Sequence, residues 1–590
     1  MADKWNLSSV LDARTGQDFD KVKEQLEAEV KEFERLRPGL AQLDREGLMG
    51  ALDAYSRMSE LKQRLNSYSL MLFSEDTRNQ EAKVLVDRAS DMWAEVDNRA
   101  LFFRLWWISL PDEKAADLRP PGGDYAFFLD SLRKLKPYTL EEKVEQVINL
   151  KNTTGAWQWA HHYDHLTSSF TFLLTVRGKP MKDEKGRPRR LVASEVARLF
   201  ASPDSKMRVA AYDSLLAKYA ENGSVLGDVY RTVVRDWKNE SVKLRGYPSP
   251  IAARNTENDV PDASVRTLLE VCRKNIGAFQ DFFALKARIM GWRKMSRYHI
   301  YAPLSRTEKR VGYAAAVKQV MEAFEIFDHG YAALAKHVFE DRHVDAFPRV
   351  GKTSGAYCMS VTPKITPYLF LNFANAPRDI YTIAHESGHA VHSQLASSHS
   401  MLTFHPTLVL AETASVFGEM LLFDKMMKEE KDAGVKKAVL IDKISGMYST
   451  IGRQAHFVIF ESDAHLAVGE NATVDDLCSL YLQNLKGQFG RRVEVPASFQ
   501  WEWTYIPHIY HTPFYCYAYA FGNLLSLALY ERYREEGKEF VQKYLRLLSH
   551  GGSMSPKMIL GEVGADMDSE GFWQGGFDVI TRMVSELRRL

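Results

Sequence analysis

The residues best suited to chemistry in this chain are His-Glu-Ser-Gly-His at positions 385–389. The flanking residues favour a helix, in which side chains four positions apart share one face. His385 and His389 can therefore direct their imidazole nitrogens at one metal ion, and zinc accepts such nitrogens at about 2.0–2.1 Å. Glu386 follows the first histidine, where a carboxylate can take a proton from a zinc-bound water. The pentapeptide predicts two metal ligands and a general base; the alternative is a surface helix with two unrelated histidines.

A catalytic zinc site needs a third protein ligand. A third histidine six residues after His389 is excluded, because Leu395 occupies that position. Glu412 follows His389 by 23 residues in an apolar segment that favours a helix, and an inward glutamate there can complete the site. Glu419 lies two helical turns further on the same face, where it can support a ligand through a hydrogen bond. His392 is better explained as a supporting or core histidine than as a ligand.

A second group of candidate residues lies in the aromatic segment from Tyr505 to Tyr519. Attack of water on a peptide carbonyl creates an oxyanion, and hydrogen-bond donors held at that oxygen accelerate the reaction by about 10²–10³ each. Tyrosine hydroxyls and an imidazole of this segment can act as such donors. Tyr515, Tyr517 and Tyr519 alternate in the sequence, so on a helix they cannot all face the metal. An aromatic core helix is the alternative explanation for this segment.

Glycine-rich and strand-like segments precede the histidine helix. The segment 351–357 carries Lys352 among glycines, but it lacks the spacing of a phosphate-binding loop, so that function is excluded. The segment 367–373 favours a strand. Such a strand can present an edge to an extended peptide, or it can be an ordinary core strand.

The remaining elements are mostly helical. Apolar residues recur at steps of three and four between Phe19 and Phe33, which predicts an amphipathic helix. Residues 170–186 favour a short strand and a hairpin. Ser202 is a candidate helix cap before Pro203. We expect an N-terminal helical domain over 1–190 and a catalytic domain over 191–590.

Composition excludes some partners and favours a compartment. The 590 residues carry a formal net charge of +1, which gives no attraction to nucleic acid or to an anionic membrane. The apolar run 514–530 is short for a membrane span and contains Asn523, so it predicts a buried helix. The residues from Met1 to Asn6 contain no apolar segment typical of a signal peptide. With four scattered cysteines, these features predict a cytoplasmic protein without disulfide bonds.

The order and spacing of several motifs resemble the oligoendopeptidase F branch of the thimet oligopeptidase family of zinc peptidases. The likeness is dense from about 350 to 580 and weak before residue 120. The matching motifs are Gly351-Lys352, Gly355-Ala356-Tyr357, Pro367-Tyr368, Asn372-Phe373, the pentapeptide 385–389 with His392, Glu412-Thr413-Ala414-Ser415, Glu419, Pro507-His508, the run from Tyr515 to Tyr519, and Gly551-Gly552-Ser553.

This resemblance implies a mainly helical, two-lobed body with a deep central channel and a small β-sheet next to the metal-binding helix. It implies one zinc ion per chain, bound by His385, His389 and Glu412, with Glu386 as the base. His508 and one or two tyrosines would stabilise the oxyanion; Tyr510, Tyr515 and Tyr517 are candidates, and Tyr515 and Tyr517 are favoured.

The implied activity is cleavage of internal bonds in short, unstructured peptides, with folded proteins excluded. A zinc carboxypeptidase of similar architecture is one alternative, and a catalytically inert peptide-binding protein is another. The sequence leaves the oligomeric state and the cleavage preference open.

Overall fold

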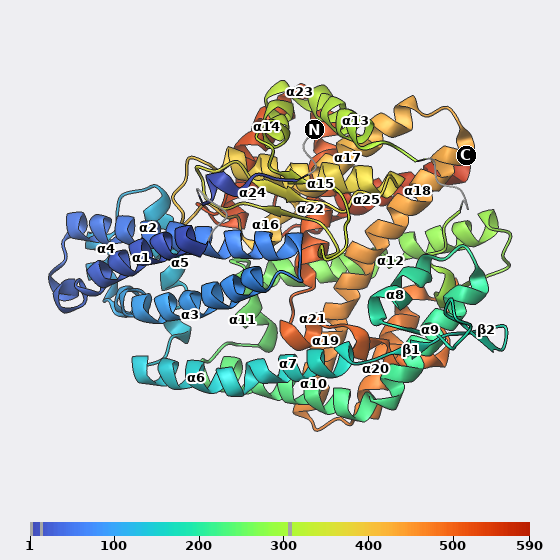
Figure 1. The fold of residues 1–590 in the computed structure, drawn as a ribbon, viewed down its shortest axis with the longest axis horizontal. Coiled ribbons are helices and arrows are strands. Elements are labelled where there is room, and N and C mark those ends of the chain that lie inside the picture. The colour runs from blue at the N-terminus through green and yellow to red at the C-terminus, as the bar shows by residue number, and fades with distance from the viewer. Residues whose placement is uncertain (1–3, 12–15, 305–309) are drawn as a thin grey trace. The chain divides into compact units, whose positions relative to one another are not determined.

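The protein is described by a computed structural model that covers residues 4–11, 16–304 and 310–590 (Figure 1). Residues 1–3, which entered the signal-peptide prediction, lie outside the described residues. The fold is mainly helical, as predicted, and its strands are only two or three residues long. Among the described helices, none is both long enough and apolar enough to cross a lipid bilayer.

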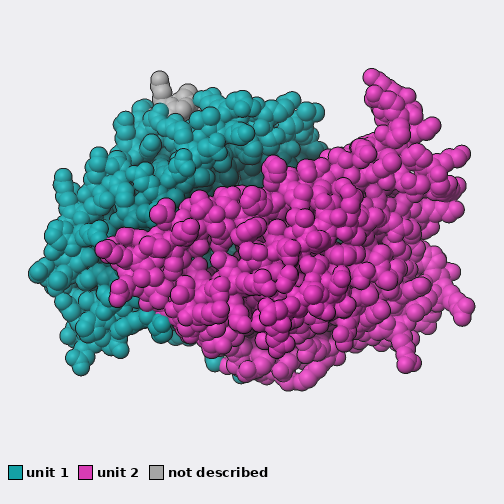
Figure 2. Space-filling view, turned by 90° about the horizontal axis from the view of Figure 1, so that it is seen from below, with its two compact units in different colours: residues 1–137, 308–428, 529–566 teal, residues 138–307, 429–528, 567–590 magenta. Residues whose placement is uncertain are grey.

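The chain divides into two compact units, coloured separately in Figure 2. Unit 1 comprises residues 1–137, 308–428 and 529–566, and unit 2 comprises residues 138–307, 429–528 and 567–590. Each unit is thus built from three separate stretches of the chain. The units are defined by packing in space and are discontinuous in sequence, whereas the expected domains 1–190 and 191–590 are continuous stretches. That expected division stays a prediction.

Unit 1 is a helical body with one three-stranded sheet. Its elements are η1 (Leu7–Ser9), α1 (Gly16–Glu34), η2 (Arg37–Gln42), α2 (Arg45–Glu75), α3 (Gln80–Ser109), α4 (Asp112–Leu118), α5 (Asp124–Arg133), η3 (Lys136–Tyr138), α13 (Tyr313–Phe327), α14 (His329–Glu340), β6 (Val344–Asp345), β7 (Tyr357–Met359), β8 (Tyr368–Phe370), α15 (Pro377–Leu395), α16 (Leu408–Ala411), α17 (Thr413–Glu429), α23 (Lys538–Ser549) and α24 (Pro556–Glu562). Helix α22 (Tyr517–Glu536) begins in unit 2 and ends in unit 1.

The core of unit 1 follows from the amphipathic pattern of its first helices. Phe19, Leu26 and Phe33 on α1 are all buried, which confirms the helix predicted between Phe19 and Phe33. They pack with α2 and α3 in one apolar cluster that also includes Tyr368 and Phe370 of β8. The long helices and the sheet therefore share one apolar core.

The sheet has the order β6-β8-β7, with β6 parallel and β7 antiparallel to β8. Both β7 and β8 pack against α15, which confirms a small sheet beside the helix that carries His385 and His389. The strand predicted within 367–373 is β8, which is paired on both sides and has three buried residues. It is therefore a core strand, and the alternative that this strand presents an edge to a peptide is wrong.

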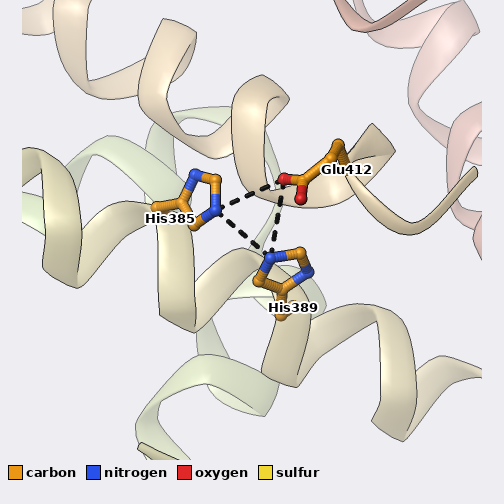
Figure 3. Close-up of side chains that lie close together, drawn as sticks. All are labelled: His385, His389 and Glu412. Atoms are coloured by element: carbon orange, nitrogen blue, oxygen red, sulfur yellow. Dashed lines mark hydrogen bonds and ion pairs between the residues drawn. The ribbon is translucent and has the colours of Figure 1, made fainter. Parts of the chain in front are cut away.

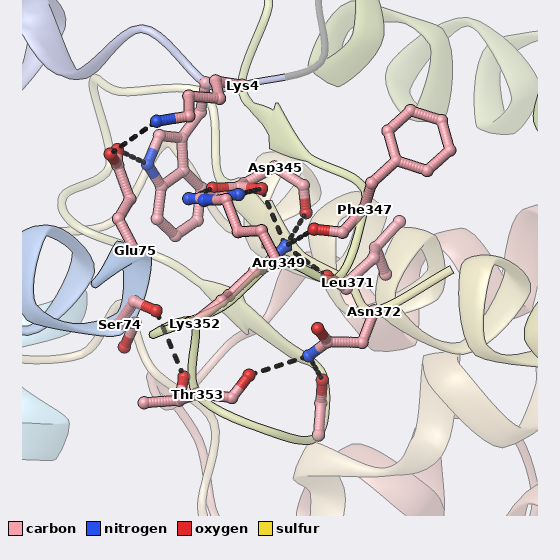
Figure 4. Close-up of polar contacts among 12 residues, drawn as sticks. Lys4, Ser74, Glu75, Asp345, Phe347, Arg349, Lys352, Thr353, Leu371 and Asn372 are labelled. Atoms are coloured by element: carbon pink, nitrogen blue, oxygen red, sulfur yellow. Dashed lines mark hydrogen bonds and ion pairs between the residues drawn. The ribbon is translucent and has the colours of Figure 1, made fainter. Parts of the chain in front are cut away.

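A buried lysine fixes the loop that leads into β7 (Figure 4). The Lys352 ammonium is fully buried and donates to Asp345 Oδ1 at 2.7 Å, to the Phe347 carbonyl at 3.0 Å and to the Leu371 carbonyl at 2.5 Å. Arg349 binds the same Asp345 carboxylate through two hydrogen bonds of 2.6 Å. The glycine-rich segment therefore uses its lysine to tie the sheet together, in agreement with the exclusion of a phosphate loop.

Unit 2 is also helical, with short strand pairs. Its elements are α6 (Glu142–Thr154), α7 (Ala156–Ser168), β1 (Phe172–Leu173), β2 (Thr175–Val176), β3 (Lys179–Pro180), β4 (Arg190–Leu191), α8 (Ala193–Arg198), η4 (Leu199–Ala201), α9 (Ser205–Glu221), α10 (Gly223–Trp237), the π-helix η5 (Lys238–Leu244), α11 (Pro250–Glu257), α12 (Asp262–Ile289), β5 (Met295–Ser296), η6 (Arg297–His299), α18 (Ala433–Met447), the π-helix η7 (Tyr448–Gly452), α19 (Arg453–Gly469), α20 (Val474–Phe489), β9 (Val493–Glu494), η8 (Ala497–Tyr505), α21 (His508–His511) and α25 (Glu570–Arg589).

Two local predictions in unit 2 have different outcomes. The hairpin expected within 170–186 is confirmed by the antiparallel pair β2 and β3. The cap of α9 is Asp204 rather than Ser202, because the Asp204 carboxylate accepts the Lys206 N–H at 2.9 Å and the helix begins at Ser205. The Ser202 hydroxyl instead accepts the Asp204 N–H at 3.2 Å, in the turn before the helix.

Candidate metal centre

Helix α15 begins at a proline and is capped by a carboxylate. Pro377 occupies the first helical turn, where a missing N–H removes no hydrogen bond. The Asp379 carboxylate accepts the N–H groups of Ala374 at 2.7 Å and Ala376 at 2.9 Å. These contacts fix the start of the helix two turns before His385, so the histidine ligands are presented from a rigid element.

His385, His389 and Glu412, here called the ligand trio, converge at one point (Figure 3). The Nε2 atoms of the two histidines lie 3.2 Å apart, and Glu412 Oε2 lies 3.3 Å from His385 Nε2 and 3.7 Å from His389 Nε2. The three atoms lie within 4.8 Å of one another. Among the residues that the structure describes, this trio is the one cluster of three or more side chains arranged to hold a metal ion.

Glu412 reaches the histidines from the junction of two helices. It caps the end of α16 and directly precedes α17, and its Oε2 also accepts the Ser415 hydroxyl at 2.8 Å. The donor set of two imidazole nitrogens and one carboxylate oxygen is one that zinc uses in catalytic sites, with a further position for water or substrate. The residues present therefore fit a zinc ion.

Glu419 orients the first histidine, as expected. Its carboxylate accepts the Nδ1–H of His385 at 2.7 Å. The lone pair of Nε2 is therefore directed toward His389 and Glu412, where a metal ion would bind. Burial lowers the pKa of His385, but the hydrogen bond and charge of Glu419 outweigh it and raise this pKa to about 9. His392 is buried, and burial lowers its pKa to about 3, which fits a core histidine.

A glycine inside the motif permits helix α15 to approach α17. A β-carbon on Gly388 would lie 2.4 Å from the Ala414 carbonyl oxygen and 2.7 Å from the Ser415 α-carbon. Both are backbone atoms at the start of α17, just after Glu412. The absence of a side chain at position 388 is therefore what brings Glu412 within reach of the histidines.

Glu386 is buried between α15 and strand β7, with 6% of its surface exposed. Burial raises the pKa of its carboxyl to about 7, while the charge of His385 and the backbone N–H of Cys358 on β7 lower it. The side chain thus follows the first histidine in sequence and contacts the sheet in space.

The predicted oxyanion donors lie in unit 2 and have different environments. His508 and Tyr515 are partly exposed, and their rings stack with centroids 6.1 Å apart. Tyr517 is fully buried, and its hydroxyl accepts the Asn258 side-chain N–H at 2.7 Å. Tyr510 is also buried and donates to the Leu226 carbonyl at 3.3 Å. The environment of Tyr517 and Tyr510 favours a role in packing.

Tyr519 joins the cluster and was not among the predicted site residues. Its ring lies 5.3 Å from Tyr515 and 6.0 Å from His508, measured between centroids. Tyr515 lies in the turn before α22, so the alternating tyrosines do not share one helix. Because Tyr515 precedes the helix, the spacing in the sequence gives no signal that pairs it with Tyr519.

Comparison with known proteins gives a consistent result over the full chain. The family model described as peptidase family M3 matches residues 198–579, and the model described as oligopeptidase F matches residues 106–172. The plasmid-encoded oligoendopeptidase F of Lactococcus lactis subsp. cremoris is 25% identical over 99% of this chain and 97% of its own length. Oligopeptidase PepF of Bacillus subtilis (strain 168) is 25% identical over 96% of this chain and 84% of its own.

Solved structures show the same fold. The crystal structure of oligoendopeptidase-F from Enterococcus faecium superimposes with a TM-score of 0.73 at 21% identity, covering 97% of this chain and 99% of that one. Together with the family models, the helical fold and the donor set define a metallo-oligopeptidase. The chain belongs to peptidase family M3, and its substrates are peptides.

Proposed function

We propose that this protein is a zinc-dependent oligoendopeptidase that hydrolyses internal bonds of short, unstructured peptides. The observation that carries the proposal is the convergence of the ligand trio within 4.8 Å, with Glu386 on the same helix as two of its members. When bound, zinc supplies a Lewis acid for the scissile carbonyl and for water. The proposal includes one ion per chain and the channel, implied by the family resemblance, that would exclude folded proteins.

Glu386 acts as the proton carrier in this proposal. Its carboxylate accepts a proton from the attacking water and passes it to the amine that leaves. His508 and Tyr515 hold the carbonyl oxygen as it gains negative charge. A role of Tyr517 in stabilising the oxyanion is supported only by the family resemblance, because its hydroxyl is buried and bonded to Asn258.

Strand β7 supplies a peptide-binding edge in the same proposal. It is the last strand in the order β6-β8-β7, so its outer side has no partner strand among the described residues. An extended peptide can pair with such an edge through its main chain, which accepts many sequences in one register. Because the backbone of Cys358 on β7 lies close enough to Glu386 to affect its pKa, this edge would place the substrate beside the base.

Glu386→Gln is the variant that tests the mechanism. It keeps the size of the side chain but removes the proton acceptor, so kcat should fall by at least about 10²–10⁴-fold while zinc stays bound. The substrate is an internally quenched peptide blocked at both ends, and zinc is measured by elemental analysis. Glu429→Gln, at the exposed end of α17, is the control and should keep full activity.

Several results would contradict the proposal. Substantial turnover by the Glu386→Gln variant would refute the role of the base. Cleavage only of peptides with a free C-terminus would indicate a carboxypeptidase. Bound zinc without hydrolysis of any peptide in a mixed library would indicate an inert binding protein.

A cytoplasmic location is also part of the proposal. All four cysteines are free thiols, which fits a reducing compartment. Fractionation of cells that express the tagged chain tests this location directly.

A further inference from the structure

Unit 2 contains a buried cluster of two arginines and one glutamate. Arg297 on η6 and Glu502 on η8 have side chains only 1% and 3% exposed. Arg297 Nη2 donates to Glu502 Oε1, and Arg453 Nη2 donates to the same oxygen at 3.1 Å. The second oxygen of Glu502 accepts the Tyr481 hydroxyl at 3.1 Å. One carboxylate is thus shared by two guanidinium groups.

The cluster carries an excess positive charge. Arginine stays protonated in proteins, so two cations face one anion. Of the groups with the strongest electrostatic effect on Arg297 and Arg453, Glu502 is the one carboxylate and the others are tyrosines or the paired arginine. Arg297 and Glu502 form the buried pair, and the excess positive charge lies on Arg453, whose side chain is 21% exposed. This charge can attract a further negative group.

A cavity of about 230 Å³ opens beside this charge. Its polar wall is formed by Tyr301, Arg453, Glu502 and Tyr505, and its apolar wall includes Leu215 and Leu216. We call it the Arg453 pocket. Its volume is several times the roughly 30 Å³ that one water occupies in the liquid, so it has room for a small organic group.

Unused hydrogen-bond donors face the pocket. The Tyr301 hydroxyl is buried and has no hydrogen-bond partner among the described residues. Arg453 uses one N–H toward Glu502, and its side chain is 21% exposed. A guanidinium group carries five N–H donors in a planar fork that matches the two oxygens of a carboxylate. The Tyr301 hydroxyl is therefore free to form a hydrogen bond with a ligand that enters the pocket.

The backbone before Arg453 has an unusual conformation. The π-helix η7 runs from Tyr448 to Gly452 and ends where α19 begins at Arg453. Such π-helical turns are rare and are frequently found at functional sites, because the extra residue changes the direction of the following side chain. The feature distinguishes Arg453 from an arginine on a regular helix.

The pocket is close to a group that the proposed mechanism uses. Tyr505 of its wall lies three residues before His508. Burial lowers the pKa of His508, and the charges of His511 and Arg453 lower it further, so the guanidinium acts on this imidazole.

We propose that the Arg453 pocket binds a carboxylate of the peptide substrate, between the Arg453 guanidinium and the Tyr301 hydroxyl. The proposal rests on the proposed peptidase function and names the substrate class, which is peptides that carry a carboxylate. That carboxylate is either the free C-terminus or the side chain of an aspartate or glutamate. The arginine would make the enzyme prefer peptides with a carboxylate at this position, but it would not require one particular amino acid.

Matched peptide pairs test the proposal. One pair differs only in a C-terminal acid or amide, and a second series, amidated at the end, carries glutamate or glutamine at each position in turn. The wild-type enzyme should show a kcat/KM about 10-fold or more higher for the acid in at least one pair, because a charge-assisted double hydrogen bond is lost in the amide. The pair that responds identifies the source of the carboxylate.

Variants assign the preference to the pocket. Arg453→Gln should bring the acid-to-amide ratio of kcat/KM to about 1, whatever its effect on the amide peptides themselves, and Glu502 keeps its bond to Arg297 in this variant. Arg453→Lys keeps the charge without the fork and should restore part of the preference, while Tyr301→Phe should reduce it by several-fold. Arg231→Gln is the control: its side chain is also 21% exposed, it pairs with Asp228, and the preference should be unchanged.

A binding measurement separates this proposal from the peptidase proposal. Calorimetry with the Glu386→Gln protein compares N-acetyl tetraalanine as the free acid and as the amide, with a glutamate-containing amide as the third probe. Tighter binding of an acid that is lost in the Glu386→Gln/Arg453→Gln double variant supports the pocket even if no peptide is hydrolysed. Equal values for every acid and amide pair, or equal losses for both members in Arg453→Gln, would overturn it. Competition by chloride alone, with no peptide effect, would also overturn it.

Discussion

Both ring nitrogens of His385 have a role in the proposed site. The hydrogen bond made by Nδ1 orients Nε2 toward Glu412 and His389. This Nδ1–H is held by Glu419 at 2.7 Å, so the imidazole cannot rotate away from Glu412. We expect Glu419→Ala to lower zinc affinity by about 10–100-fold, the usual cost of losing such a supporting carboxylate. Competition with a chelator of known affinity measures this change.

The exposed residue Glu429 on the same helix provides the comparison for Glu419. The Glu429→Ala variant changes the net charge equally but lies at the far end of α17. Its zinc affinity should equal that of the wild type. Equal losses in both variants would show that general charge, rather than the hydrogen bond to His385, sets the affinity.

Glu461 on α19 should give the protein a distinctive dependence of stability on pH. It is fully buried, and burial raises the pKa of its carboxyl to about 8, although the Phe514 N–H and Arg254 lower it. Tyr230 and Cys516, which also face it, are neutral groups whose pKa values burial raises. The folded chain therefore keeps a proton, between about pH 4.5 and pH 8, that the unfolded chain has released.

Stability should consequently fall as pH rises through that window, by up to about 1.4 kcal/mol per pH unit from this one group. In the Glu461→Gln variant the neutral amide still offers an oxygen to the Phe514 N–H, which Glu461 accepts at 2.9 Å. Denaturant unfolding from pH 5 to pH 8 should thus show a shallower decline for this variant. Parallel profiles for variant and wild type would contradict the prediction.

Residues whose roles depend on local spacing could be predicted, and those that depend on long-range packing could not. The two histidines follow from the helical repeat, and Glu412 follows from its place in an apolar segment. Glu461 was missed, because its function depends on Phe514, which adopts a left-handed backbone with a φ of 59°. The sequence of that turn does not predict a left-handed residue at this position, because phenylalanine rarely adopts that backbone conformation.

At the scale of elements, the contact between α15 and the start of α17 assembles the site. An alanine at position 388 would place its β-carbon 2.4 Å from the Ala414 carbonyl oxygen. Alanine favours a helix over glycine by about 1 kcal/mol, but overpacking against backbone costs about 1–3 kcal/mol or more, so the clash should dominate. Gly388→Ala should lower both the melting temperature and zinc affinity.

Gly277 is the matched control for Gly388. It lies within α12, and an added β-carbon meets nothing within 4 Å. Gly277→Ala should therefore keep or slightly raise stability, through helix propensity alone. If Gly388→Ala were as stable as Gly277→Ala, the two helices would have room to separate without affecting the metal site.

The type of most elements was predictable, but their ends were less so. The first helix follows from apolar residues between Phe19 and Phe33 that repeat with the helical period. The start of α9 differs from the prediction, because Ser202 and Asp204 are both good caps and tertiary contacts select between them. Strand β6 was missed because its two residues carry too little periodicity, whereas β8 lies within a longer run of strand-favouring residues.

At the scale of the whole molecule, each compact unit is assembled from three stretches of the chain. A sequence shows linkers through local changes in composition, but it does not show which distant stretches pack together. The sequence therefore suggested one boundary near 190, whereas unit 1 ends its first stretch at residue 137 and resumes at 308. Long-range packing of apolar faces determines this division.

Metal binding should stabilise unit 1 selectively, because all three proposed ligands lie in it. A ligand that binds only the folded form raises the free energy of opening of the region that holds it. Removing zinc with a chelator should increase amide hydrogen exchange in α15 and in the first turns of α17. Exchange in α20 of unit 2 should stay constant.

Mass spectrometry of peptic fragments measures this exchange. Restoring zinc should reverse the change in the wild type but not in the His385→Ala variant, which lacks one ligand. A uniform increase across α15 and α20 would contradict selective stabilisation of unit 1.

The packing of α23 against α15 has a consequence for synthesis on the ribosome. By residue 412 a nascent chain already carries every proposed ligand, yet the helix that supports α15 starts only at Lys538. The growing polypeptide thus lacks part of the scaffold around its histidines until translation is nearly finished. We therefore expect His385 and His389 to be held less firmly in a chain shortened before Lys538 than in the full chain.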